Sequence, residues 1–198
     1  GGSVWTPGWM PVKAKLDSYE CRHGLGYTRI TGKKAGLKAE QLSFVPRGVD
    51  ALVTRVQLTN NSDAVKDVSL FSFVEFCLWN AQDDSTNFQR NFSTGEVEIE
   101  GSAIYHKTEY RERRNHFAVY AVNADIEGFD TDRASFIGYY NGFGEARVPF
   151  ANQSNNSVAS GFSPIGSHCI KRAIDPGETL SLVFVLGYCE NPEDQKFS

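Results

Sequence analysis

Hydrogen-bonding side chains are densest in NAQDDSTNFQRNFSTG, residues 80–95, which directly follow the most apolar part of the chain. In an extended conformation Asn87, Gln89 and Asn91 project to one side, and the neighbouring Phe residues project to the other. The Phe residues would anchor the segment on a core, while three amides point outward together. Neutral amides both donate and accept hydrogen bonds, which suits a polyhydroxylated ligand; an ordinary Asn-rich loop is the alternative.

A second candidate is the charged run HKTEYRERRNH, residues 106–116. It sets four cationic side chains against two carboxylates, a net charge of +2 before the His residues are counted. Arg side chains bind carboxylate or phosphate through two parallel hydrogen bonds, so an anion site is one interpretation. The other is a solvated connection whose charges pair with one another.

Three further features carry weaker signals. Gly24 and Gly26 lack the third Gly and the following helix of a dinucleotide-binding motif, so they indicate a Gly-rich strand or bulge. His23 has no evident nucleophile beside it, so a hydrolase triad is not supported. Trp5 and Trp9 could form a sugar-stacking platform or a packed corner of the fold, and both interpretations remain open.

The cysteines Cys21, Cys77, Cys169 and Cys189 form no CxxC pair, and only Cys169 adjoins a His, so we expect no metal site. A domain of this size does not need disulfides, so we expect reduced thiols and a cytoplasmic location.

The bulk composition is that of a single globular domain. The chain has 198 residues, which suffices for one sizeable core. Charged residues make up 22% and the net charge is −4, which gives no reason to expect nucleic acid as a partner. There is no run of about 18 apolar residues, so no membrane span is predicted. Aromatic residues make up 13%, which suits half-buried strands and sugar binding.

Strand patterns recur at short intervals and helix patterns are nearly absent. Strands are predicted at 37–45, 51–59, 68–80, 95–101, 102–107, 116–123, 135–140, 167–174 and 179–188. The stretch DPGE at 175–178 predicts a tight turn between the last two. Neighbouring strands joined by short turns predict an all-β, mainly antiparallel fold of two packed sheets.

The stretch at 68–80 is apolar on both faces, so we expect it to lie centrally in its sheet, covered on both sides. Glu75 interrupts one of these faces and needs a partner there. An Arg is the expected partner, and the 106–116 run could supply it.

Several long strings resemble one family: LFSFVEFCLWNAQDD, TNFQRNFSTGEVEIEGSAIYHKTEYRERRNH, NSVASGFSPIGSH, FVLGYCENPED and the opening SVWTPGWMPVKAKLDSYECRHGLGYTRITG. They resemble the N-terminal domain of the inverting glycoside phosphorylases, which include cellobiose, cellodextrin and chitobiose phosphorylases. The cellobiose type is the nearest. The resemblance covers essentially the whole chain in order.

The resemblance implies a large antiparallel supersandwich of the galactose-mutarotase type and a cytoplasmic enzyme. Such enzymes cleave cellobiose with inorganic phosphate, a co-substrate, to α-D-glucose 1-phosphate and glucose, with inversion and without a cofactor. A carboxylic acid protonates the glycosidic oxygen while phosphate attacks the anomeric carbon from the opposite face. That acid lies on a C-terminal (α/α)6 barrel, which is absent here. We therefore expect residues 1–198 to be an N-terminal domain truncated at both ends, without a catalytic residue of its own.

Members of the family are homodimers, and the loop matching NFQRN reaches toward the acceptor sugar in the partner subunit's active site. The resemblance thus assigns substrate binding to Gln89, Arg90 and Asn91. No nucleic acid and no membrane are expected as partners.

Other functions remain open. One is a related phosphorylase of the cellodextrin type. Another is a non-catalytic carbohydrate-binding module built on Trp5 and Trp9. A third is a mutarotase-like enzyme, which would need a carboxylate converging in a cleft with one of the His residues, His23, His106, His116 or His168.

Overall fold

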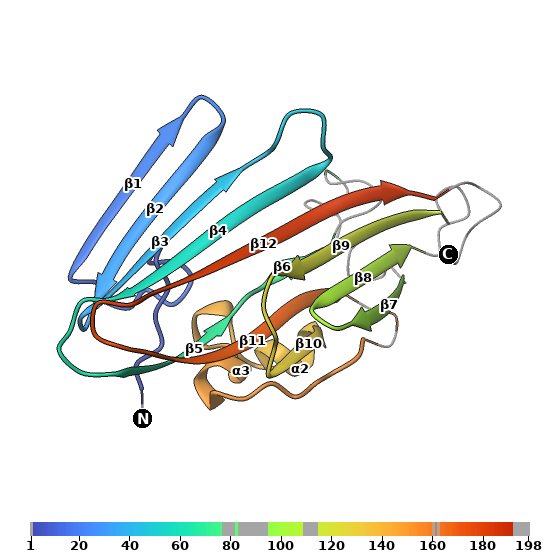
Figure 1. Cartoon of the computed structure of the whole chain (residues 1–198). Coiled ribbons are helices and arrows are strands. Elements are labelled where there is room, and N and C mark those ends of the chain that lie inside the picture. The colour runs from blue at the N-terminus through green and yellow to red at the C-terminus, as the bar shows by residue number, and fades with distance from the viewer. Residues whose placement is uncertain are drawn as a thin grey trace.

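The computed structural model describes residues 2–76, 82, 95–108, 115–159, 161 and 163–191. Its strands form two antiparallel sheets, as predicted, and the two sheets pack face to face (Figure 1). No helix in these described ranges is both long enough and apolar enough to cross a membrane.

The larger sheet has eight strands in the spatial order β1-β2-β3-β4-β12-β9-β8-β7. Their bounds are β1 Ser18–Gly24, β2 Tyr27–Lys34, β3 Leu37–Phe44, β4 Ala51–Asn60, β7 Gly95–Glu100, β8 Ala103–Thr108, β9 His116–Val122 and β12 Thr179–Glu190. Most of these strands pair with their neighbours in sequence, but β12 returns from the end of the chain to lie between β4 and β9.

The smaller sheet is built around β11 (Pro164–Ile174), which pairs with β10 (Gly128–Asp132) on one side. On its other side β11 pairs with both β5 (Lys66–Phe71) and β6 (Val74–Glu75). All of these ladders are antiparallel.

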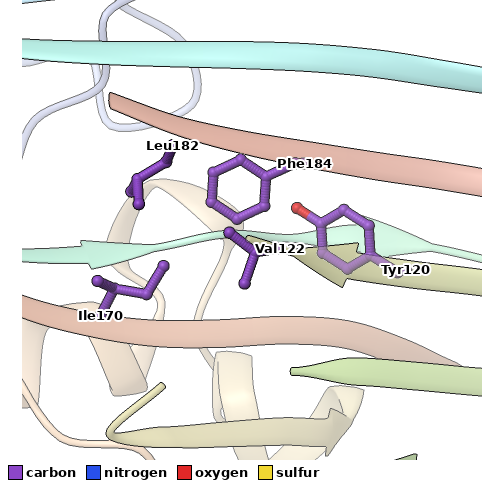
Figure 2. Packing of buried hydrophobic residues seen from close by; sticks show 5 residues of the cluster. All are labelled: Tyr120, Val122, Ile170, Leu182 and Phe184. Carbon is purple, nitrogen blue, oxygen red and sulfur yellow. The ribbon is translucent and has the colours of Figure 1, made fainter. Parts of the chain in front are cut away.

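The core between the sheets follows from the alternation of apolar residues along the strands. Figure 2 shows five of its side chains pointing toward one another: Tyr120 and Val122 from β9, Ile170 from β11, and Leu182 and Phe184 from β12. Each of the five is at most 6% exposed. Burial on this scale is the main force holding the two sheets together.

A helical connection covers the other face of the smaller sheet. It consists of α2 (Arg133–Ile137), the 3-10 turn η3 (Phe143–Glu145) and α3 (Arg147–Ala151). Phe136 and Ile137 of α2 belong to a second buried cluster, against which Phe71 and Phe73 pack. The sandwich therefore carries a short third layer, visible below β5 and β11 in Figure 1.

The strand predicted at 135–140 is wrong, because residues 133–137 form α2 instead. The Asp132 carboxylate caps this helix by accepting a hydrogen bond from the Ser135 amide at 2.6 Å. Gly138, at φ +94°, ends it. Tyr139 and Tyr140, predicted to lie in the strand, are 86% and 102% exposed.

The strand predicted at 68–80 is confirmed in part. Strands β5 and β6 pair with β11 in one register, Phe71 with Cys169 and Val74 with Gly166. Between them, Ser72 and Phe73 interrupt the strand. The predicted cover on both faces is confirmed, because the larger sheet lies on one side and the helical connection on the other. The predicted central position is wrong, since β5 ends its sheet in the described part of the chain. Residues 77–80 lie outside the described ranges.

The remaining strand predictions are confirmed with small shifts at their ends. The tight turn at 175–178 is confirmed, with Gly177 at φ +80° and a hydrogen bond from the Glu178 amide to the Asp175 carbonyl. Gly24 and Gly26 lie at the turn that joins β1 to β2 in an antiparallel hairpin.

Candidate functional site

Four strands of the larger sheet end or begin at the same end of the sandwich. Cross-strand pairs join Glu190 of β12 to His116 of β9, and Gly95 of β7 to Thr108 of β8. The C-terminal ends of β12 and β8 therefore lie beside the N-terminal ends of β9 and β7 (Figure 1). We call this the junction end of the sandwich.

The predicted substrate-binding residues Gln89, Arg90 and Asn91 lie outside the described residues. Three of the Arg residues in the charged run, Arg111, Arg113 and Arg114, lie outside them too. The structure does place the residues that flank these stretches. Phe76 and Gly95 bound the segment 77–94, and both are near β8 at the junction end.

His106 is the residue that the two flanks share. Its ring stacks on the Phe76 ring with centroids 5.0 Å apart. The Gly95 main chain lies so close that a Cβ there would be 2.2 Å from His106 Cε1. His106 is 4% exposed, and burial lowers its pKa to about 4, with the Glu96 main chain acting in the opposite direction. The ring is therefore neutral near pH 7.

Glu75 has the Arg partner that was predicted for it. The Arg133 Nε donates to Glu75 Oε1 at 2.7 Å, and the Arg133 guanidinium lies over the Phe143 ring at 5.0 Å. Arg133 belongs to α2 rather than to the 106–116 run. This ion pair ties β6 to the helical connection immediately before Phe76.

An open groove of about 670 Å³ adjoins these residues. Its walls include Val45 and Leu52 near the start of β4, Leu186 and Tyr188 of β12, and Glu75. The walls are mainly apolar with a few polar groups, and the groove is broadly open to solvent.

Beside the groove, His116, Tyr188 and Glu190 form a cross-strand cluster. The Tyr188 hydroxyl donates to Glu190 Oε1 at 2.7 Å and also contacts His116 Nδ1. His116 Nδ1 is 3.6 Å from the same carboxylate oxygen. The cluster brings a His and a carboxylate together beside the groove, which is the arrangement that the mutarotase-like alternative needs. In this structure His116 and Glu190 both bond to Tyr188.

The other candidate His residues are placed elsewhere. His23 bonds to Thr28 across the exposed β1–β2 hairpin. His168 is fully buried between the sheets, where Ser72 Oγ lies 3.1 Å from its Nδ1. Burial lowers the His168 pKa to about 4 as well.

The two Trp residues lie in different surroundings. Trp5 packs against a buried cluster that includes Ala39, Leu58 and Ile174, whereas Trp9 is 47% exposed. This division supports the packed-corner interpretation for Trp5, so the pair does not provide a two-ring platform for a sugar.

Within the described ranges, no three His, Cys, Asp or Glu side chains gather as a metal site would require. Cys21, Cys169 and Cys189 are free thiols, and burial raises the pKa of Cys169.

Two antiparallel sheets packed face to face define the class of the protein as an all-β sandwich. A family model described as "Glycosyl hydrolase 94, supersandwich domain" matches residues 1–196. The chain belongs to this family.

Two of the curated relatives are named as phosphorylases of different disaccharides. N,N'-diacetylchitobiose phosphorylase of Vibrio proteolyticus is 31% identical over 189 residues, which are 94% of this chain and 24% of that protein. Solabiose phosphorylase of Paenibacillus borealis is 28% identical over 192 residues, 97% of this chain and 25% of that protein. The chain thus spans about a quarter of the length of these curated relatives.

A solved structure described as a kojibiose phosphorylase from the human microbiome matches 93% of this chain and 21% of its own. The TM-score is 0.54 and the sequence identity is 11%, so this likeness shows the fold alone.

Sequence reasoning missed the role of Arg133 and the contacts of His106 with both flanks. No local pattern marks either residue, since the partner of Arg133 and the Phe76 partner of His106 lie on strands distant in sequence. The one available signal was the need of Glu75 for a cationic partner.

Proposed function

We propose that this chain is the N-terminal sandwich of a cytoplasmic, cellobiose-type phosphorylase. The whole enzyme would convert cellobiose and inorganic phosphate to α-D-glucose 1-phosphate and glucose with inversion, without a cofactor. Membership of the glycosyl hydrolase 94 supersandwich family and the phosphorylase names of two relatives support this proposal. The choice of cellobiose is the most specific element of this proposal, because those relatives are named for other substrates.

One observation supports a role for residues 77–94 in the sugar site. The residues at both ends of this segment, Phe76 and Gly95, contact the same side chain, His106, near the groove. Both flanks of the segment that carries Gln89, Arg90 and Asn91 therefore lie at the junction end of the sandwich.

The chemistry divides between the two parts of the enzyme. Phosphate is already a competent nucleophile, so the reaction needs one carboxylic acid to protonate the leaving oxygen. That acid would come from the C-terminal catalytic domain. The amides of Gln89 and Asn91 would bind the hydroxyls of the acceptor glucose, and Arg90 would contribute charged donors. In a homodimer this sandwich would serve the active site of the partner subunit.

The activity is tested with the full-length protein, cellobiose and phosphate, by measuring glucose 1-phosphate. Turnover of cellobiose well above that of N,N'-diacetylchitobiose and cello-oligosaccharides supports the proposal. A preference for longer chains would favour the cellodextrin type instead. Chromatography with light scattering should give twice the mass of one chain, and a monomer would contradict the shared site.

The binding role is tested with Gln89→Ala in the full-length enzyme running in the synthetic direction. Loss of one neutral hydrogen bond should raise the KM for glucose about three- to tenfold. Gln153→Ala is the control, because Gln153 is an exposed amide after α3. Kinetic constants equal to wild type for Gln89→Ala would show that the assignment is wrong.

The 198-residue chain alone should release no glucose 1-phosphate from cellobiose, because the proposed acid belongs to another domain. Calorimetry with cello-oligosaccharides gives the second readout. Tight binding by this chain alone would favour a free-standing carbohydrate-binding module over a half-site.

A further inference from the structure

Cys21 and His23 lie on one face of β1, at the edge of the larger sheet opposite β7. Residues two apart in a strand project to the same face, so the two side chains can meet. The Cys21 Sγ is 3.4 Å from His23 Nε2. The sequence showed no evident nucleophile beside His23, whereas the structure places a thiol within hydrogen-bond distance of its imidazole.

The second strand of the hairpin holds the other side of this imidazole. Thr28 of β2 is paired with His23 across the hairpin, and its Oγ1 is 3.0 Å from His23 Nδ1. When Nδ1 donates to this hydroxyl, Nε2 keeps the lone pair that can accept the thiol proton. Cys21, His23 and Thr28 thus stand in the order of nucleophile, base and orienting group that activates a cysteine.

The Cys21 thiol is within reach of solvent as well as of its base. Cys21 is free and half-buried, and every other residue of β1 is exposed. The Tyr19 side chain, on the same face, lies close enough to hydrogen-bond with Cys21. Cys169, by contrast, is buried in the core. Partial exposure beside a base is the usual setting of a reactive cysteine, whereas a buried thiol is inert.

We propose that Cys21 is a modification site for small disulfides, with His23 as the base that accepts its proton and Thr28 as the residue that positions the imidazole. The Cys21 sulfur attacks one sulfur of the disulfide, and a new S–S bond forms as the old one breaks. The electron pair leaves with the second sulfur as a thiolate, and the thiol proton passes to His23 Nε2. The product is a mixed disulfide, which excess thiol reverses. This site does not depend on the proposed function.

The test measures the reaction of the full-length protein with glutathione disulfide and locates the mixed disulfide by peptide mass spectrometry after acid quenching. Cys21 should react about tenfold faster than Cys189, an exposed free thiol that lies opposite Phe117 in its ladder. A rate at Cys21 equal to or below that at Cys189 would show that the thiol is not activated, and the proposal would fail.

Three variants identify the source of the reactivity. His23→Ala should lower the rate at Cys21 about tenfold and leave the rate at Cys189 unchanged. His23→Gln keeps hydrogen-bonding groups but cannot take up the proton, so its rate should stay low. Thr28→Val removes the hydroxyl beside Nδ1 and should lower the rate by a smaller factor. A wild-type rate in His23→Gln would show that the imidazole has only a structural role and would overturn the proposal.

The matched control is Arg22→Ala. Arg22 lies on the same strand, but its side chain projects to the opposite face and pairs with Glu20 at 2.7 Å. Its replacement should leave the rate at Cys21 close to wild type. If Arg22→Ala slows the reaction as much as His23→Ala does, the integrity of β1 rather than the imidazole controls the thiol. If His23→Ala fails to fold, Thr28→Val decides by the same comparison of rates.

Discussion

Two buried His residues of the same sandwich lie in contrasting surroundings. His168, in the central core, bonds to Ser72 through both its ring and its main chain and contacts the rings of Tyr120 and Phe184. His106, at the junction end, lies between Phe76 and the main chain of Gly95. Burial lowers both pKa values to about 4.

The comparison shows that two equally buried His residues make different kinds of contact. Around His168, the hydrogen bonds of the main chain and of the Ser72 hydroxyl join β11 to Ser72, which lies between β5 and β6. These contacts stabilise the sandwich itself. Around His106, the contacts join the sandwich to the two ends of the segment that carries the candidate sugar-binding residues. A change at His168 should therefore alter stability, and a change at His106 should alter binding as well.

The largest expected effect is a loss of stability in acid. Both His residues are neutral in the folded chain down to about pH 4. In the unfolded chain they take up protons below their ordinary pKa of about 6.5. Stability is thus fully present above pH 6.5 and is lost as the pH falls toward 4, by about 3 kcal/mol per His. Denaturant unfolding at a series of pH values measures this loss.

The variants His106→Phe and His168→Phe separate the two contributions to the acid loss. Each should reduce the difference in unfolding free energy between pH 7 and pH 4 by a similar amount. An acid dependence unchanged by either replacement would show that the buried His residues are not its cause.

A smaller effect is expected from Ser72→Ala. The Ser72 hydroxyl oxygen accepts a hydrogen bond from the His168 main-chain amide at 2.9 Å and bonds to the ring at 3.1 Å. Removing it leaves buried polar groups unpaired, which should cost roughly 3 kcal/mol. Ser181→Ala, at an exposed position on β12, is the control. The KM for glucose of the full-length enzyme should not change, and a raised value would contradict the contrast between the two His residues.

The smallest effect on stability is expected from Gly95→Ala, which should also weaken the binding of glucose. The added methyl group must displace His106 or the Lys107 main chain, which should cost about 2 kcal/mol. It should also raise the KM for glucose. Gly142→Ala is the matched control, because nothing lies within 4 Å of an added Cβ there. A neutral outcome at both glycines would show that the Gly95 contact is not tight.

Prediction from sequence succeeded where local pattern and tertiary environment agree. The alternation in 51–59 and 179–188 defined β4 and β12, because each strand turns one face to the core. It failed at 135–140, where an apolar run matched a strand but Asp132 and Gly138 began and ended a helix. The apolar residues on both faces of 68–80 correctly predicted that both faces are covered, but the predicted central position in the sheet was wrong. Cover on both faces does not require a central strand, because the helical layer covers one face of β5 and the second sheet covers the other.

The sequence by itself determined the all-β class, most of the strands, the tight turn after Ile174 and the need of Glu75 for a cation, because these depend on neighbours a few residues apart. Only the tertiary structure decided that Arg133 supplies the cation and that Phe76 and Gly95 meet at His106. The Glu75–Arg133 and Phe76–His106 contacts join residues far apart in the chain, whereas Gly95 and His106 lie on neighbouring strands of one hairpin. The distant contacts exist because two sheets must close over one apolar core, which no local pattern encodes.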